Sequence, residues 1–209
     1  VGNTAVGYYA LSGATGANST TAVGHLAGRD LTTGDYNTII GKSAGLENET
    51  SHGNSVLGFE AGYYPTGAYN TFMGYRAGKG GSSADAGSNV GIGQEAMMNL
   101  TSGDENTAVG SQAGYSISTG GYNVAIGSDS FRAATSANYN VAIGKNSMST
   151  GITTSPHNIG IGYQANNVVA GGSGYNIALG AYAGQSITTS AHNIFIGREA
   201  GSGSNGANH

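Results

Sequence analysis

The chain has 209 residues, of which only 9% carry a charge, and its formal net charge is −4. This balance argues against binding to nucleic acid, which requires a basic face to displace counterions from phosphate. Cysteine is absent, so neither a disulfide framework nor a thiolate metal site is expected, and no apolar run approaches the ~20 residues of a membrane-spanning helix.

One phrase, Asn-x-x-aliphatic-Gly-x-x-Ala, recurs twelve times along the chain. Its anchoring glycines are Gly7, Gly24, Gly41, Gly58, Gly74, Gly93, Gly110, Gly127, Gly144, Gly162, Gly180 and Gly197. Seven of the eleven intervals between them are 17 residues long, and the others are 16, 18, 18 and 19. A fixed period this short is typical of a stacked solenoid, in which each repeat buries its apolar face only against its neighbours. The alternative suggested by the glycine-rich composition, a disordered linker, does not account for this regularity.

The first element expected in each repeat is a short strand that ends at the anchoring glycine. The residue directly before the glycine is aliphatic in all twelve repeats, and the residue two positions before that one is β-branched in eleven. Because residues two apart on a strand share a face, we expect both columns to line the interior of the coil. The column between them is Ala or Gly in eight repeats, and we expect it to face outward, against a second chain.

A second strand is expected after the glycine, where the third residue is Ala in ten repeats and Ser130 or Ser147 in the other two. Two short strands per coil would stack as a flattened roll, with glycine permitting the turn between them. The asparagine that opens each repeat is present in eleven of twelve coils, with Thr20 as the exception. Stacked amides predict a structural hydrogen-bond ladder, and ligand binding by these side chains is the alternative.

The expected fold is therefore all-β, a parallel β-roll or β-solenoid of about twelve 17-residue coils over residues 1–201. Residues 202–209 are expected to form a flexible tail. Solenoids normally carry polar caps, and none is recognisable here, so we interpret the chain as a piece of a longer fibrous protein. A coil this thin buries little apolar surface, which favours self-association, and we expect a homotrimer.

The repeats resemble those of known fibrous proteins. Val124-Ala125-Ile126-Gly127 and Val141-Ala142-Ile143-Gly144 are similar to the Val-Ala-Ile-Gly core of head repeats in YadA-type trimeric autotransporter adhesins. The longer form, as in residues 3–11 and 33–38, resembles repeats in bacteriophage tail fibres. The resemblance covers nearly the whole chain and implies a left-handed parallel β-roll that associates in threes. Because the usual adhesin repeat is a few residues shorter than 17, the tail-fibre interpretation is preferred.

A candidate receptor-binding surface lies in the variable positions after the glycines, where aromatic and cationic side chains are densest at Phe59, Tyr63, Tyr64, Tyr75 and Arg76. Tyrosine and arginine offer flat apolar area together with hydrogen bonds, which suits sugar rings or protein epitopes. The alternative is that these rings pack against a neighbouring coil or chain. A second candidate is the inserted loop at residues 79–85, because loops on a rigid scaffold often carry binding.

A tyrosine often precedes the repeat asparagine, and we expect these rings to stack as a structural column. Its members are Tyr36, Tyr69, Tyr122, Tyr139 and Tyr175, with His157 and His192 in equivalent places. Two imidazoles two coils apart are too distant to share a metal ion within one chain, so no metal site is expected. The eleven carboxylates show no pair repeated at coil spacing, and no nucleophile elbow, zinc-protease motif or phosphate-binding loop occurs. We therefore predict a protein without catalytic activity or cofactor.

The function expected from these observations is that of a structural and receptor-recognition segment of a trimeric bacteriophage tail fibre, in the virion. Its partners would be two further copies of itself and a host-surface glycan or protein receptor, without direct membrane insertion. The main alternative is the head of a bacterial cell-surface adhesin. A fibre that degrades surface polysaccharide is disfavoured by the missing carboxylate pattern. An ice-binding solenoid is disfavoured because it requires an outward threonine array, whereas the threonine column is expected to face inward.

Overall fold

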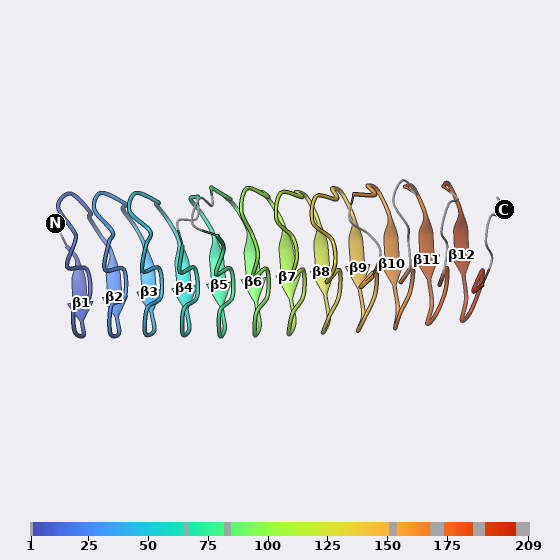
Figure 1. Cartoon of the computed structure of the whole chain (residues 1–209), viewed down its shortest axis with the longest axis horizontal. Coiled ribbons are helices and arrows are strands. Elements are labelled where there is room, and N and C mark those ends of the chain that lie inside the picture. The colour runs from blue at the N-terminus through green and yellow to red at the C-terminus, as the bar shows by residue number, and fades with distance from the viewer. Residues whose placement is uncertain are drawn as a thin grey trace.

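The structure is a computed structural model of the chain, and it describes residues 2–64, 67–81, 85–150, 154–167, 174–185 and 191–203. These residues form a rod of stacked coils with β1 at one end and β12 at the other (Figure 1). Each coil contributes one three-residue strand, and all strands join a single parallel sheet in chain order. The strands are β1 (Thr4–Val6), β2 (Thr21–Val23), β3 (Thr38–Ile40), β4 (Ser55–Leu57), β5 (Thr71–Met73), β6 (Val90–Ile92), β7 (Thr107–Val109), β8 (Val124–Ile126), β9 (Val141–Ile143), β10 (Ile159–Ile161), β11 (Ile177–Leu179) and β12 (Ile194–Ile196). We number each coil after its strand and include in it the turn that follows.

Equivalent positions of successive repeats lie directly over one another. Val109 pairs with Ile126, which pairs with Ile143. The register is kept across the 19-residue interval, where Thr71 pairs with Val90, so the extra residues lie in the turn. These pairings confirm the predicted parallel β-solenoid. In the ranges described above, no helix is long and apolar enough to cross a membrane.

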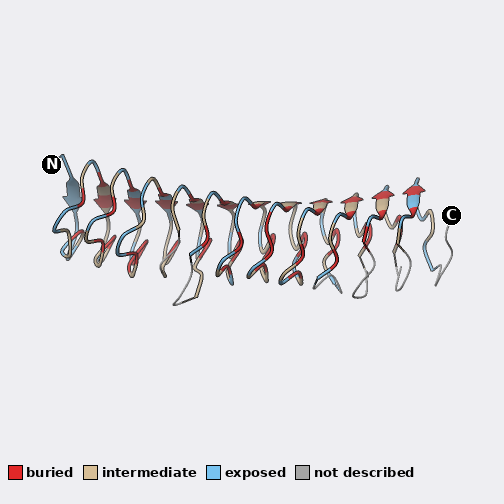
Figure 2. Cartoon of the chain, turned by 90° about the horizontal axis from the view of Figure 1, so that it is seen from above, coloured by how far each residue is buried: buried red, intermediate tan, exposed pale blue. Residues whose placement is uncertain are grey.

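The predicted orientation of the strands is wrong. The central residue of the strand, not the two flanking ones, faces the interior: Ala22, Ile39 and Ala125 are fully buried, and buried residues recur at the same place in successive coils (Figure 2). The flanking aliphatic residues face outward, and Leu57 and Ile126 keep 42% and 39% of their surface exposed. The small central column fits the interior because it packs opposite the small Ala column of the facing wall, which is also buried.

The predicted second strand is wrong. In the described residues, the segment after each anchoring glycine is a turn. The second residue after the glycine has a positive φ in every coil, for example 60° at Leu26 and 55° at Ser43. This left-handed conformation is incompatible with a β-strand. The turns still stack through backbone hydrogen bonds between coils, such as Leu26 N–H to Tyr8 C=O at 2.9 Å.

The anchoring glycines are required by backbone geometry, as the sequence predicted. Gly110 has a φ of +136°, and a Cβ built on it would lie 2.7 Å from the carbonyl carbon of Gly127 in the next coil. A side chain at this position would therefore be strained and would also strike backbone that cannot move aside.

The repeat asparagines form the expected ladder along the rod. From Asn3 to Asn176 the Oδ1 atom accepts the backbone N–H of its counterpart in the next coil, as Asn106 does from Asn123 at 3.0 Å and Asn123 from Asn140 at 3.0 Å. The Oδ1 atom of Asn193 in the last coil is left without a partner among the described residues. The side-chain amide of Asn123 also donates to the carbonyl of Ala137 at 2.8 Å. Thr20 fills the same role through its hydroxyl oxygen, which accepts the N–H of Asn37 at 3.3 Å. The asparagine ladder is therefore structural, and its amides are occupied in holding the coils together.

Candidate functional site

The structure brings the five residues of the predicted receptor-binding surface together on coils 4 and 5. The rings of Phe59 and Tyr75 stack with centroids 5.5 Å apart and planes 9° apart, whereas Tyr63 and Tyr64 meet edge to face at 4.9 Å. Arg76 lies over the ring of Tyr75, 4.9 Å from its centroid. The stacking arises because Phe59 and Tyr75 occupy the same position, directly after the glycine, in adjacent coils.

One carboxylate links the two halves of this cluster. The Oε2 atom of Glu60 accepts from Arg76 Nε at 2.9 Å and from Lys79 Nζ at 2.8 Å, and Lys79 in turn lies 5.3 Å from the ring centroid of Tyr63. Burial raises the pKa of Glu60, but hydrogen bonds and charge from Lys79 and Arg76 outweigh it and hold the pKa below 4.5. Burial and the nearby Glu47 raise the pKa of Tyr63. The sequence reasoning did not select Glu60, although it lies beside Phe59, and it assigned Lys79 to the second candidate, the loop at residues 79–85, rather than to this cluster.

Phe59 and Tyr75 turn one ring face toward each other, and a cation lies beside each ring. Lys42 lies 5.8 Å from the centroid of Phe59, and Arg76 lies 4.9 Å from that of Tyr75. Tyr75 nevertheless keeps 43% of its surface exposed, so the flat apolar contact expected of these rings stays a prediction. The predicted alternative, packing against the neighbouring coil, accounts for one face of each ring. Of the second candidate, the loop at 79–85, residues 82–84 lie outside the described part of the chain.

A second set of rings stacks continuously along the C-terminal coils, two positions before the strands β8 to β12. Successive ring centroids lie 4.9–5.0 Å apart with planes within 12°. This ring ladder consists of Tyr122, Tyr139, His157, Tyr175 and His192. The nearby carboxylate of Glu105, followed by Tyr139, raises the pKa of Tyr122.

The stacking confirms the structural column expected from the sequence over these five coils. The two imidazoles are separated by the ring of Tyr175. Across the described ranges, no group of three or more His, Cys, Asp or Glu side chains is placed to hold a metal ion.

The outward side of the sheet, which the sequence reasoning assigned to the interior, runs along all twelve described strands. It comprises the first and third residue of every strand, and none of these side chains is buried. Its first column is Thr4, Thr21, Thr38, Ser55, Thr71, Val90, Thr107, Val124, Val141, Ile159, Ile177 and Ile194, and its second is Val6, Val23, Ile40, Leu57, Met73, Ile92, Val109, Ile126, Ile143, Ile161, Leu179 and Ile196. We call this surface the outward sheet face. It contains no charged residue, which is the sequence signal that could have drawn attention to it.

The outward threonines overturn one argument made from the sequence. An ice-binding face was disfavoured because the threonine column was expected to point inward, and that reason no longer holds. The column is nevertheless irregular, since Ser55 and Val90 interrupt it and Val or Ile replaces threonine from Val124 onward. A regular array of threonine hydroxyl groups therefore covers only part of the rod.

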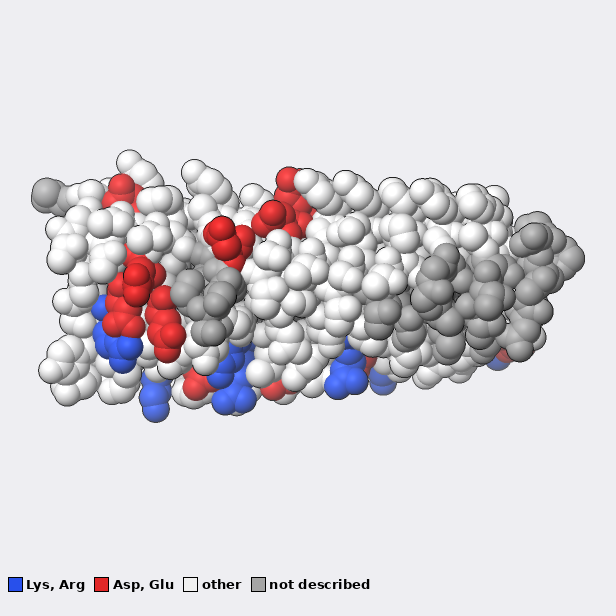
Figure 3. All heavy atoms as spheres, turned by 45° about the horizontal axis from the view of Figure 1, so that its top comes forward, with Lys and Arg blue, Asp and Glu red and all other residues white. Residues whose placement is uncertain are grey.

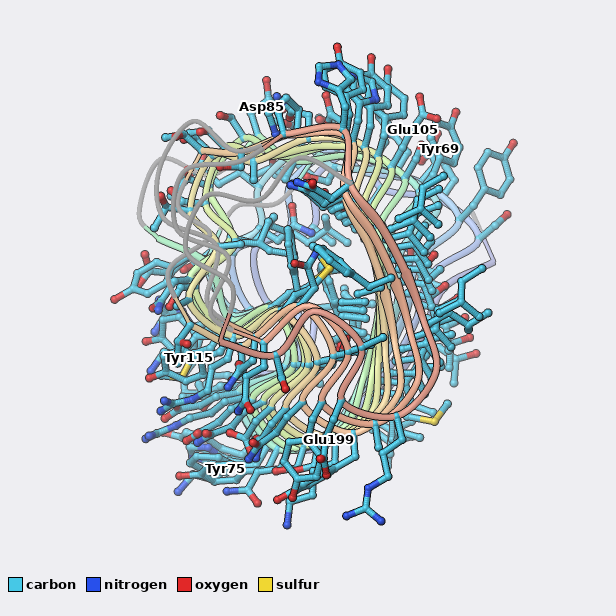
Figure 4. The ribbon with its side chains drawn as sticks, turned by 90° about the vertical axis from the view of Figure 1, so that its right-hand side faces the viewer. Tyr69, Tyr75, Asp85, Glu105, Tyr115 and Glu199 are labelled. Atoms are coloured by element: carbon cyan, nitrogen blue, oxygen red, sulfur yellow. The ribbon has the colours of Figure 1, made fainter. Side chains whose placement is uncertain are left out.

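The surfaces that flank the outward sheet face differ in chemistry. Figure 4 views the coil along the rod. It shows Tyr69 and Glu105, which precede their strands, at one corner of the coil, and Tyr75, which lies in a turn, on a different side. Ten of the eleven carboxylates precede Ser130 in the sequence, and in the view of Figure 3 most of the acidic atoms lie over the N-terminal and middle coils. The coils that carry the purely aliphatic part of the face are thus also the ones poorest in charge.

Comparison with known proteins adds no assignment to these surfaces. No protein-family model matches the chain, and neither the curated proteins nor the solved structures contain a match.

Proposed function

We propose that this chain is a structural and receptor-recognition segment of a homotrimeric bacteriophage tail fibre that mediates attachment to the host surface. The observation that carries the proposal is the outward sheet face, which presents two uninterrupted, uncharged columns along the full series of strands. The second column is aliphatic in every coil and the first is aliphatic from Val124 onward, and contiguous apolar surface of this kind marks an interaction site. The occupant that fits is a second copy of the same chain, because only a partner with the same repeat matches the face coil for coil.

Three copies around a common axis suit the shape of this face better than two. Each strand has only two outward residues, so the face is narrow and long. In a threefold arrangement each chain has two neighbours, and one column can pack against each of them. The centre of the assembly is then aliphatic and its rim carries the polar and aromatic columns, which is the usual anatomy of a stable interface. The resemblance of the repeats to trimeric heads and fibres supports the same number.

A rod of this construction is suited to holding a recognition surface away from its attachment point. Every coil is tied to the next by strand pairing, by turn hydrogen bonds and by the asparagine ladder. Side chains in the turns vary freely without changing this backbone. The cluster around Phe59 and Tyr75 lies on the turns, away from the outward sheet face, so it stays accessible in the proposed trimer and is the candidate contact for a host-surface glycan or protein receptor.

Two measurements test the proposal. Light scattering of the purified chain is expected to give three times the chain mass of 20.7 kDa, and a monomer mass at micromolar concentration would contradict it. The fluorescently labelled chain is then expected to bind intact cells of a subset of a panel of bacterial strains. Binding to immobilised animal matrix proteins, with no bacterial strain bound, would favour the adhesin alternative instead.

A further inference from the structure

The position directly after each anchoring glycine forms a second continuous surface strip over the N-terminal coils. In coils 1 to 5 its residues are Tyr8, His25, Lys42, Phe59 and Tyr75, which we call the axial strip. Tyr8 and His25 stack at 5.4 Å, Lys42 lies 5.8 Å from the centroid of Phe59, and Phe59 and Tyr75 stack at 5.5 Å. In none of the twelve coils is this position a carboxylate. The strip therefore combines rings and cations without an acidic residue of its own.

The way in which the rings are held determines what the strip can bind. Phe59 and Tyr75 turn one face toward each other and hold Lys42 and Arg76 beside their rings, so the ring edges and the charged groups are the parts of the strip that remain for a ligand. The edge of an aromatic ring carries the positive part of its quadrupole. An edge-on stack between two cations is thus electropositive, and it suits an anionic group better than the flat face of a neutral sugar.

Carboxylates on the neighbouring positions are already engaged. Glu60 is shared by Arg76 and Lys79, which leaves these three side chains together with one net positive charge. Glu95, in the coil after Arg76, accepts a hydrogen bond from Gln112 at 2.8 Å. Among the ion pairs of the described residues, Lys42 has no carboxylate partner.

Arg76 also keeps donors for a ligand. A guanidinium group has five N–H donors, and the ion pair with Glu60 uses the one on Nε. Lys42 lies beside Phe59 and Arg76 beside Tyr75, so the two cations are placed to contact separate anionic groups of one ligand along the strip.

We propose that the axial strip at coils 3 to 5 binds the carboxylate or phosphate groups of an acidic cell-surface saccharide, with Lys42 and Arg76 each contacting a separate anionic group. This inference rests on the proposed attachment function and specifies its ligand. Lys42 supplies an ammonium group without a competing carboxylate, Arg76 supplies planar N–H donors, and the ring edges between them accommodate the sugar carbons next to the anion. A neutral saccharide lacks the group that these side chains select.

The test measures binding of the whole chain to three immobilised probes by biolayer interferometry: polygalacturonate, a phosphomannan and neutral dextran. Binding to one or both anionic probes and not to dextran is expected, and the probe that binds identifies carboxylate or phosphate as the ligand. Lys42→Ala is expected to weaken that binding about five- to tenfold, the effect of losing one charge-assisted contact. Lys145→Ala is the matched control, because Lys145 holds the same position in coil 9, where the ring of the next coil, Tyr163, meets Tyr182 edge to face instead of stacking on it. It is expected to change binding less than about twofold.

Three results would overturn the inference: no binding to either anionic probe, equal binding to dextran, or equal losses for Lys42→Ala and Lys145→Ala. The first and third are distinguishable from failure of the proposed function, because trimer mass and attachment to bacterial cells are measured separately on the same preparations. A trimer that attaches to cells equally well with and without Lys42 would leave the fibre proposal standing and remove the acidic-saccharide site.

Discussion

A charge introduced into the outward sheet face should abolish the trimer without unfolding the coil. Ile126 is the residue to change, because it lies between Val109 and Ile143 in the aliphatic part of the face and does not contribute to the interior. Full burial of an isoleucine side chain contributes about 1.5–3 kcal/mol, and 39% of Ile126 is exposed in the single chain. Covering that remainder contributes roughly 0.6–1.2 kcal/mol per chain, or about 2–3.5 kcal/mol for three chains.

Ile126→Asp removes this contribution and adds the cost of taking each carboxylate out of water, which is several kcal/mol per ion. The sum is more than about 5 kcal/mol, so the association constant should fall by over three orders of magnitude. Light scattering at micromolar concentration should then give the mass of one chain, with the circular dichroism spectrum of the parent. Ser111→Asp is the control, because Ser111 is exposed on a turn outside the face, and it should leave the mass unchanged. A trimer that survives Ile126→Asp would refute the assignment of this face as the interface.

Three further changes test the framework of the coil. Asn123→Ala should lower the free energy of unfolding by about 2–4 kcal/mol in urea titrations, because it leaves buried backbone groups without partners. Asn123→Thr should lower it less, since the hydroxyl oxygen of Thr20 takes the place of the asparagine oxygen in its own coil. Equal losses would show that the ladder hydrogen bonds contribute little. Gly110→Ala should lower the free energy of unfolding by more than about 3 kcal/mol or prevent folding. Gly81→Ala is the control, because its Cβ would meet only Thr101 at 3.6 Å, and it should change the free energy of unfolding by no more than about 1 kcal/mol. Similar effects of the two substitutions would contradict the glycine argument. Although burial raises it, hydrogen bonds and charge from Lys79 and Arg76 lower the pKa of Glu60 in the folded state, so its ion pairs contribute stability that is present above the unfolded-state pKa and is lost as the pH falls through the folded-state value. Acid should therefore destabilise the parent more than Glu60→Gln, and parallel curves of stability against pH would exclude this contribution.

Periodicity was sufficient to predict the stacked coils of this fold, the parallel strands that end at the anchoring glycines and the asparagine ladder. The spacing of the anchoring glycines gave the number of coils, the alternation before each glycine gave the strand, and the near-invariant asparagine gave the ladder. These features depend on the backbone repeating in register, and a fixed period reports such repetition directly. The stacked rings from Tyr122 to His192 follow from the same cause, since any column of rings at coil spacing is brought into contact.

The direction of the strand faces could not be derived from hydrophobicity. The reasoning assumed that the more apolar pair of columns must be the interior, which holds when a chain buries its core by itself. Here the interior is closed by two small columns, such as Ala125 from the strand wall, and is filled at intervals by single large residues such as Phe72 and Phe131. The second wall was predicted as a strand for a similar reason, because its Ala column gives no sign that the residue before it adopts a positive φ.

The candidate receptor-binding surface was located from composition but its chemistry was not. Counting aromatic and cationic residues selected Phe59, Tyr75 and Arg76, and these do lie together. Which part of each ring faces solvent depends on the register of neighbouring coils, so the stacking of Phe59 on Tyr75 became visible only with coordinates. That orientation changes the expected ligand from a flat sugar face to an anion.

An interior of small residues and an exterior of aliphatic ones divide the apolar side chains of this protein between the coil and the proposed interface. Small residues on both walls keep the coil thin, so one chain by itself buries little apolar surface per ordered residue. In the proposed trimer a neighbouring chain covers the larger aliphatic side chains, and that burial adds to the stability of a coil that already forms in the single chain. Threonine in the first coils and isoleucine in the last ones place most of the apolar area toward the C-terminal end of the rod. Association of the proposed trimer should therefore be strongest at the C-terminal end. The N-terminal coils, which carry the axial strip, gain less stability from the neighbouring chains. Side chains in that part of the rod can therefore serve recognition instead of assembly.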